Sequence, residues 1–189
     1  MKVRILFLIC FLSITCLLNA ADKPVIQIHT DNSSLIFRVA DNGRLYQSYL
    51  GKKLNHEADI SHLPQGTEAY ITHGMEDYFE PAIHILHNDG NPSLLLKYVS
   101  HETKAVSQGV NETIITLGDD KYPVTVKLHY VTYPAEDIIK TYTEISHKEK
   151  KPVVLHQYAS SMLHLNRAKY YLTEFSGDWA HEANISDQP

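Results

Sequence analysis

The stretch that decides the fold is Val-Thr-Val-Lys-Leu-His-Tyr, residues 124–130. Hydrophobic side chains occupy every second position, and Thr125, Lys127 and His129 stand between them. Successive side chains of a β-strand point to opposite faces, so this alternation predicts a strand with one buried face and one polar face.

Similar runs lie on both sides of this strand. They are rich in β-branched and aromatic residues, which favour strands. We expect strands at residues 25–29, 35–39, 94–99, 113–117, 138–146, 153–160 and 170–175. No stretch after residue 21 has a helical apolar stripe of adequate length.

Turn residues separate the expected strands. Asp41-Asn42-Gly43 and Asn88-Asp89-Gly90 contain residues that tolerate a positive φ, as tight hairpins require. Asp119-Asp120 and the charged run 147–152 separate further strands. Many short strands at regular spacing predict an all-β, antiparallel sandwich of two broad sheets.

The N-terminus has the layout of a secretory signal peptide. Lys2 and Arg4 precede an apolar stretch, residues 5–18, which ends at small residues around Ala20. The stretch is short for a membrane span, so a cleaved signal peptide at residues 1–20 is favoured over an anchor or a buried helix. We expect a secreted or periplasmic domain at residues 21–189, with no membrane contact after cleavage. Lipid attachment at Cys16 is disfavoured, because no Gly or Ala precedes that cysteine.

Composition excludes several classes of protein. The formal net charge of −5 disfavours nucleic acid and anionic membranes as partners, and loss of Lys2 and Arg4 would make the chain more acidic. Both cysteines, Cys10 and Cys16, lie within the signal peptide, which excludes disulfides, a cysteine nucleophile and thiolate metal sites in the mature chain.

No cofactor or metal is predicted. The sequence has neither a P-loop nor a dinucleotide-binding fingerprint. His84 and His87 stand three residues apart, a spacing that places them on opposite faces of a strand. Ser160-Ser161 lies near two histidines but lacks the Gly-x-Ser-x-Gly elbow of a serine hydrolase.

Two clusters combine acidic and aromatic residues. The segment 74–81, Gly-Met-Glu-Asp-Tyr-Phe-Glu-Pro, is interpreted first as a polar loop that enters a strand. Alternatively, its carboxylates and rings bind a sugar.

The segment 175–182 holds the only tryptophan, Trp179. We expect Gly177-Asp178 to form a hairpin turn and Trp179 to anchor the next strand in the core. The alternative is an exposed platform that stacks on sugar.

Three ordered blocks resemble one known family. Residues 41–54 resemble the first hairpin of the N-terminal domain of glycoside hydrolase family 36, the family of melibiase-like α-galactosidases. Residues 74–82, with the His-Asn-Asp-Gly turn at 87–90 and Tyr-Val-Ser-His-Glu at 98–102, resemble the Gly-x-x-Asp-Tyr/Phe-Arg-x-Pro-Ala segment and its downstream strand. Residues 172–182 resemble the Phe-x-Gly-x-Trp-x-x-Glu hairpin.

The resemblance implies a β-supersandwich of the galactose-mutarotase type, incomplete at its C-terminus, that packs against a catalytic (β/α)8 barrel. It implies that both catalytic carboxylates belong to the missing barrel, so no catalytic residue is assigned to this chain. By the same resemblance Asp77 binds a substrate hydroxyl and Trp179 lies near the sugar, whereas Phe79 stands where many relatives carry Arg. The implied partners are the chain's own catalytic domain, an α-galactoside bound through it, and a second subunit.

Two other functions stay open at this stage. The sandwich and its acidic-aromatic clusters would also suit a free-standing carbohydrate-binding module. A sugar mutarotase would need a histidine and a carboxylate as acid and base, and no block resembles that pairing. We expect a chain cut off before the barrel to expose apolar surface, and therefore to be poorly soluble or oligomeric when produced alone.

Overall fold

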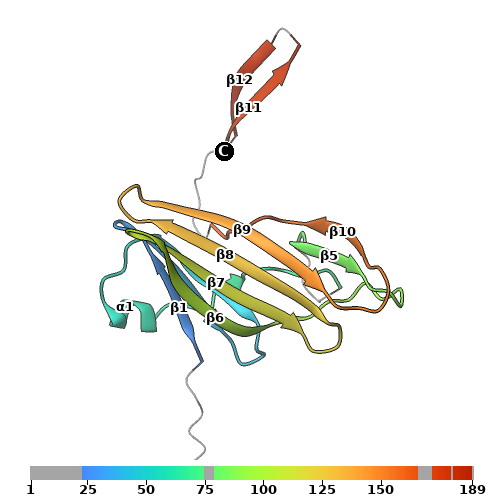
Figure 1. The fold of residues 1–189 in the computed structure, drawn as a ribbon. Coiled ribbons are helices and arrows are strands. Elements are labelled where there is room, and N and C mark those ends of the chain that lie inside the picture. The colour runs from blue at the N-terminus through green and yellow to red at the C-terminus, as the bar shows by residue number, and fades with distance from the viewer. Residues whose placement is uncertain (1–22, 75–78, 166–171, 180, 189) are drawn as a thin grey trace, which may run out of the picture.

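A computed structural model describes residues 23–74, 79–165, 172–179 and 181–188 of the chain. The predicted signal peptide, residues 1–20, lies outside the described residues, and so does Asp77. The described chain is built almost entirely of antiparallel strands (Figure 1), so the predicted all-β sandwich is confirmed. No helix in the described ranges is long and apolar enough to cross a membrane.

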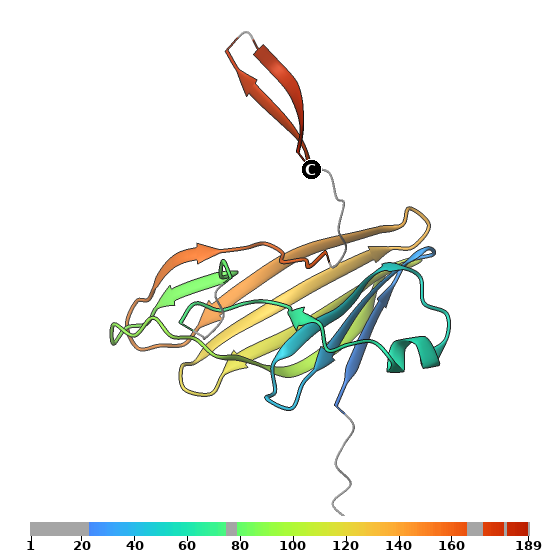
Figure 2. The same ribbon diagram turned by 180° about the vertical axis from the view of Figure 1, so that it is seen from behind.

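Two four-stranded sheets form the body of the domain. The first has the order β1-β2-β3-β4, with bounds Val25–His29, Ser33–Val39, Leu45–Lys52 and Thr67–Glu68. The second has the order β6-β7-β8-β9, with bounds Leu96–Ser107, Val110–Asp119, Val124–Tyr133 and Ile138–His147. The sheets lie face to face, and helix α1 (Glu57–Ser61) lies beside β1 (Figures 1 and 2).

Two smaller sheets complete the described structure. Strand β5 (Ile83–Leu86) pairs with β10 (Val154–Tyr158) at one end of the sandwich. Strands β11 (Leu172–Asp178) and β12 (His181–Gln188) pair with each other as a hairpin that stands away from both large sheets (Figures 1 and 2).

The alternating stretch 124–130 lies within β8, as predicted. Val126 and Leu128 face the core, whereas Lys127 on the opposite face pairs with Glu144 at 3.1 Å. The turn at Asp41-Asn42-Gly43 joins β2 to β3, and Gly43 has the expected positive φ of 78°.

The prediction of a hairpin at Asn88-Asp89-Gly90 is wrong. A turn forms there, and Gly90 has φ 84°. However, the strands on its two sides do not pair with each other, because β5 pairs with β10 and β6 pairs with β7. Turn residues show where the chain changes direction. They do not show which strands pair, because pairing depends on the whole sheet.

The core fills the space between the two large sheets. Phe37 on β2 is completely buried, and its ring lies 5.1 Å from that of Tyr130 on β8. Ile115 on β7 and Ile83 on β5 are also completely buried in the same cluster. One continuous core therefore joins both large sheets and β5.

A polar cluster covers part of the outer face of the second sheet. The carboxylate of Glu112 accepts hydrogen bonds from His129 Nδ1 at 2.9 Å and from the hydroxyl of Tyr142, and Lys104 Nζ lies 3.0 Å away. These hydrogen bonds, that of Tyr142 being the strongest, lower the pKa of Glu112 from 4.5 to about 2. The cluster joins four neighbouring strands across the sheet.

Replacement of Phe37 by alanine is expected to lower the free energy of unfolding by about 3–5 kcal/mol, because it leaves a cavity between the sheets. Urea unfolding followed by circular dichroism measures the change. The control is Val106→Ala, an exposed site on β6, where a change within about 0.5 kcal/mol is expected. Equal losses for the two variants would contradict a core centred on Phe37.

Glu112 is expected to make stability depend on pH in the acid range. Its pKa is about 2 in the folded chain and 4.5 as the ordinary value, so the unfolded chain binds more protons between these pH values. Its stabilising contribution is therefore present above about pH 4.5 and is lost as the pH falls toward about 2. We expect Glu112→Gln to cost about 1–3 kcal/mol at pH 7 and to flatten this acid dependence.

The unfolding free energy of Glu112→Gln is measured by urea titration at a series of pH values. The matched control is Glu136→Gln, which removes an exposed carboxylate from the turn between β8 and β9. If Glu112→Gln loses stability with falling pH as steeply as the parent chain does, the charged form of this carboxylate is not selectively stabilised by folding.

Candidate functional site

The acidic-aromatic segment 74–81 leaves the sandwich at a fixed point. Gly74 has φ +84°, and a Cβ atom there would lie 2.9 Å from the Cα atom of Ser93. Just before it, the amide of His73 donates to the carbonyl of Ile83 at 3.0 Å. Only glycine fits this position without strain and a clash, so the backbone fixes where the segment starts.

The far end of the segment is fixed by β10. The side-chain amide of Gln157 donates to the carboxylate of Glu80 at 2.8 Å and to the carbonyl of Pro81 at 3.0 Å. Between these anchors Asp77 lies outside the described residues. Described contacts therefore hold both ends of this segment, at Gly74 and at Glu80-Pro81.

Phe79 lies on the surface beside a small hollow. Its side chain is 67% exposed. The hollow has a volume of about 220 Å³ and is lined by Phe79 together with Tyr46 and Glu68. Arg44 fixes the carboxylate of Glu68 with a bidentate contact, in which Nε to Oε1 measures 2.7 Å. An aromatic ring and a buried ion pair thus meet next to the loop.

Three histidine rings contact one another at β5, where His84 stacks on His73 and is tilted against His156. The ring centroid of His84 lies 3.7 Å from that of His73 and 4.8 Å from that of His156. Burial, and then the neighbouring histidines, lower the pKa of His84. Within the described ranges, however, no three histidine, cysteine or acidic side chains are arranged to hold a metal ion.

Sequence reasoning missed this stack, since it considered His84 only with His87. A bulge between Leu155 and Gln157 brings His156 into it, because the extra residue changes which face of β10 a side chain occupies. His73, His84 and His156 are far apart in the sequence, and their spacing gives no sign of the contact. His84 and His87 do point to different environments, as the strand spacing predicted.

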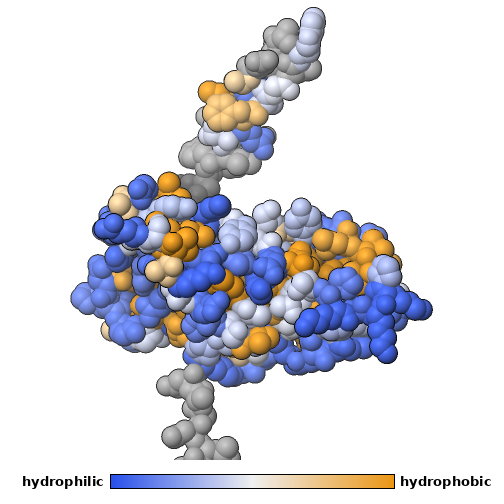
Figure 3. Space-filling view, in the orientation of Figure 1, coloured by the Kyte–Doolittle hydropathy of each residue, from blue (hydrophilic) through white to orange (hydrophobic). Residues whose placement is uncertain are grey.

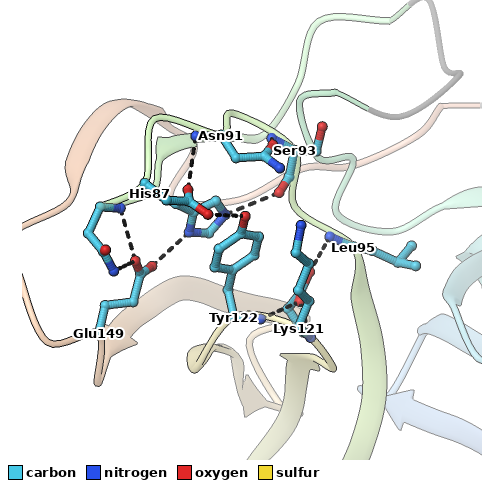
Figure 4. A network of polar contacts seen from close by, with 10 residues as sticks. His87, Asn91, Ser93, Leu95, Lys121, Tyr122 and Glu149 are labelled. Carbon is cyan, nitrogen blue, oxygen red and sulfur yellow. Dashed lines mark hydrogen bonds and ion pairs between the residues drawn. The ribbon is translucent and has the colours of Figure 1, made fainter.

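His87 is the centre of a buried network that holds the His-Asn-Asp-Gly turn (Figure 4). Its Nδ1 lies 2.7 Å from a carboxylate oxygen of Glu149, and its Nε2 lies 3.1 Å from the carbonyl of Ser93. Both partners are oxygen acceptors, an arrangement that a doubly protonated ring satisfies. The ring also stacks on Tyr122, with the centroids 3.5 Å apart.

Glu149 completes this network from the loop after β9. Its second carboxylate oxygen accepts the backbone amide of Asn88 at 3.0 Å and also the side-chain amide of Asn88. Burial would raise the pKa of Glu149, but the hydrogen bonds from Asn88 and His87 together lower it. The network connects β5 to the second sheet, so its role is structural and it fixes the elements that carry the loop.

The core position predicted for Trp179 is wrong. Its side chain is 93% exposed. Asp178 pairs with His181 across the hairpin, so Trp179 lies in the turn, and the register shift falls between Ser176 and Asp178. The turn therefore comes after Gly177-Asp178 and not at it. Because the hairpin stands clear of the sandwich (Figure 1), the tryptophan has no core to enter.

The hairpin exposes other large apolar side chains. Phe175 on β11 and Ile185 on β12 lie directly opposite each other, and they are 70% and 66% exposed. Hydrophobic colour covers part of the hairpin and the end of the sandwich where β5 and β10 lie (Figure 3). At that end Val154, Leu155 and Tyr158 are exposed. Such surfaces are typical of sites that contact another protein segment or a ligand.

Gly74→Ala is expected to destabilise the fold by more than its backbone strain alone, because the new methyl group meets Ser93. The matched control is Gly109→Ala. Gly109 also has a positive φ, of 74°, but nothing lies within 4 Å of a Cβ atom there. The control should cost about 1 kcal/mol and Gly74→Ala roughly twice that or more. Urea midpoints compare the two, and equal costs would contradict the close contact.

The fold resembles solved α-galactosidase structures. The α-galactosidase from Lactobacillus brevis has a TM-score of 0.76 and 20% identity, over 88% of this chain and 27% of that chain. The galactosidase domain of the α-galactosidase-sucrose kinase AgaSK has a TM-score of 0.78 and 20% identity, over 87% and 28%. AgaA from Geobacillus stearothermophilus, in complex with raffinose, has a TM-score of 0.78 and 18% identity, over 88% and 28%.

These likenesses show the fold, since all three identities are low. The chain spans only slightly more than a quarter of each solved structure. No curated protein sequence matches the chain. The family model described as "Glycosyl hydrolase family 36 N-terminal domain" matches residues 42–189, which is most of the chain and includes the three blocks of the sequence resemblance except for Asp41. The chain therefore belongs to the glycosyl hydrolase family 36 N-terminal domain family.

Proposed function

We propose that this chain is the non-catalytic N-terminal domain of a secreted α-galactosidase that hydrolyses terminal α-galactosides with retention of configuration. The observation that carries the proposal is the family match over residues 42–189. The likeness to three α-galactosidase structures supports it. The catalytic carboxylates would belong to a domain outside this chain.

The exposed apolar surfaces support a domain that works in contact with another. Phe175, Trp179 and Ile185 bring large apolar side chains to a two-stranded hairpin, which is marginally stable in water by itself. Contact with a catalytic domain, of the same or a neighbouring subunit, would bury Phe175 and Ile185 and leave the ring of Trp179, at the tip, facing the substrate. The exposed apolar side chains of β10 would also be buried by contact with another domain.

In this proposal two segments reach the sugar. Asp77 accepts a hydrogen bond from a substrate hydroxyl, and the described contacts of Gly74 and Gln157 hold the loop that carries it. Trp179 offers an exposed ring at the hairpin tip, and a sugar can place its C–H face on such a ring. The domain would thus shape the substrate pocket and leave the bond cleavage to the other domain.

Hydrolysis of a chromogenic α-galactoside tests the proposal. We expect turnover by the full-length gene product and none by residues 21–189 alone. Nuclear magnetic resonance of the first product should show the α-anomer, as retention requires. Turnover by residues 21–189 alone would contradict the assignment of catalysis to another domain. Sugar binding by this chain, with no hydrolysis by the full-length product, would favour the carbohydrate-binding module instead.

Asp77→Asn in the full-length product is expected to lower kcat/KM by about tenfold or more, the effect of weakening one hydrogen bond to a charged group. The matched control is Asp59→Asn, which alters an exposed carboxylate on α1 and should leave kcat/KM unchanged. Equal kinetics for the two variants would remove Asp77 from the substrate pocket.

A further inference from the structure

A wide groove lies away from the loop and the hairpin. It has a volume of about 810 Å³ and is bounded by β1, the end of β2 and helix α1, which lie side by side in Figure 2. Neither Phe79 nor Trp179 lines it. Its polar lining includes Lys23, Gln27, Arg38, Asp41 and Glu57.

Arg38 has an unused hydrogen-bond donor in this groove. Its Nη2 donates to the carbonyl of Ile60 in α1. Its Nε is buried and has no hydrogen-bond partner among the described residues. A buried donor without a partner costs free energy, about 1–3 kcal/mol, and the few that occur call for an explanation. Nε has no exposed surface, so an acceptor atom of a ligand in the groove satisfies it once the guanidinium turns outward.

Gln27 and Glu57 supply further hydrogen-bonding capacity in the groove. The amide nitrogen of Gln27 lies 3.5 and 3.4 Å from the two carboxylate oxygens of Glu57. Both distances exceed the usual range for a hydrogen bond between nitrogen and oxygen. The amide and the carboxylate therefore keep capacity for stronger hydrogen bonds to a ligand.

The charges of the groove indicate the class of ligand. Lys23 pairs with Asp41 at one end, and Arg38 is balanced by Glu57. Two cations and two carboxylates cancel, so an anion would meet two like charges as well as two opposite ones. A hydroxyl group both donates and accepts, and adjacent hydroxyls suit a lining in which carboxylates alternate with guanidinium and amide groups.

The remaining lining is apolar except for Ser61. Val25 and Val39 contribute to the walls, and Ile60, which is buried, lies between the polar groups. Such a surface can take the C–H groups of a sugar ring. We propose that this groove binds one unit of a neutral saccharide at a site separate from the loop and the hairpin. Gln27 is the donor and Glu57 the acceptor, and Arg38 Nε becomes a second donor when its guanidinium turns toward the ligand.

Hydrogen exchange of the intact protein, read by mass spectrometry during a titration with D-galactose, tests this proposal. We expect saturable slowing of amide exchange in peptides that cover β1 and α1. Gln27→Ala should raise the half-saturating galactose concentration about fivefold, the effect of one lost hydrogen bond. The matched control, Gln65→Ala, alters an exposed glutamine outside the groove and should titrate as the parent does.

Three results would overturn the proposal. The first is no change in β1 and α1 exchange with galactose. The second is protection by inorganic phosphate in its place, which would make the groove an anion site. The third is an unchanged titration for Gln27→Ala, with exchange of β7 and β8 showing that the variant is folded. The measurement does not depend on hydrolysis, so its failure is distinct from failure of the proposed function.

Discussion

Burial of apolar side chains between two facing sheets is the constraint on which the rest of this structure depends. Phe37 from the first sheet and Tyr130 from the second meet in a single cluster that also includes Ile83 of β5. Because β5 is part of that cluster, the loop that enters β5 is fixed by the same core. A change in the sheet packing would therefore move the loop as well.

Polar contacts hold the turns and connections around β5, which the apolar core alone does not fix. Glu149 binds the turn at Asn88 and the ring of His87, and this contact ties the connection after β9 to the connection after β5. Gln157 of β10 binds Glu80 and Pro81 at the end of the loop. The two contacts come from neighbouring parts of the chain, so β10 and the connection before it together hold the segment from Glu80 to Asn88.

Much of this fold could be predicted from the sequence. The alternation at 124–130 predicted β8, and similar runs predicted parts of β1, β2, β6, β7 and β9 to β11. Periodicity did not find β3, β4, β5 or β12. Strands β4 and β5 are very short and carry little pattern, whereas β3 and β12 contain many polar residues and lack a clear alternation. The pairing of β5 with β10 could not be predicted either, since it depends on residues that are distant in the sequence.

The candidate site was predictable only in part. The blocks around Gly74 and Trp179 were identified from the sequence, and the family match covers both. The exposed position of Trp179 was not predicted from the sequence. Tryptophan is usually buried, but only where its strand reaches the core, and this hairpin does not. The contact of Glu149 with His87 and the stack of His84 on His73 had no local signal, since each joins residues that only the folded sheets bring together.

The central claim is that the two large sheets bury a core of their own, while the hairpin β11–β12 presents its apolar side chains outward to a partner. Acrylamide quenching of tryptophan fluorescence tests this most directly, because Trp179 is the only tryptophan in the chain. For the monomeric fraction of residues 21–189 the account predicts quenching close to that of free tryptophan. Strong shielding of Trp179 in monomeric protein would show that the hairpin packs on its own sandwich, and would contradict the account.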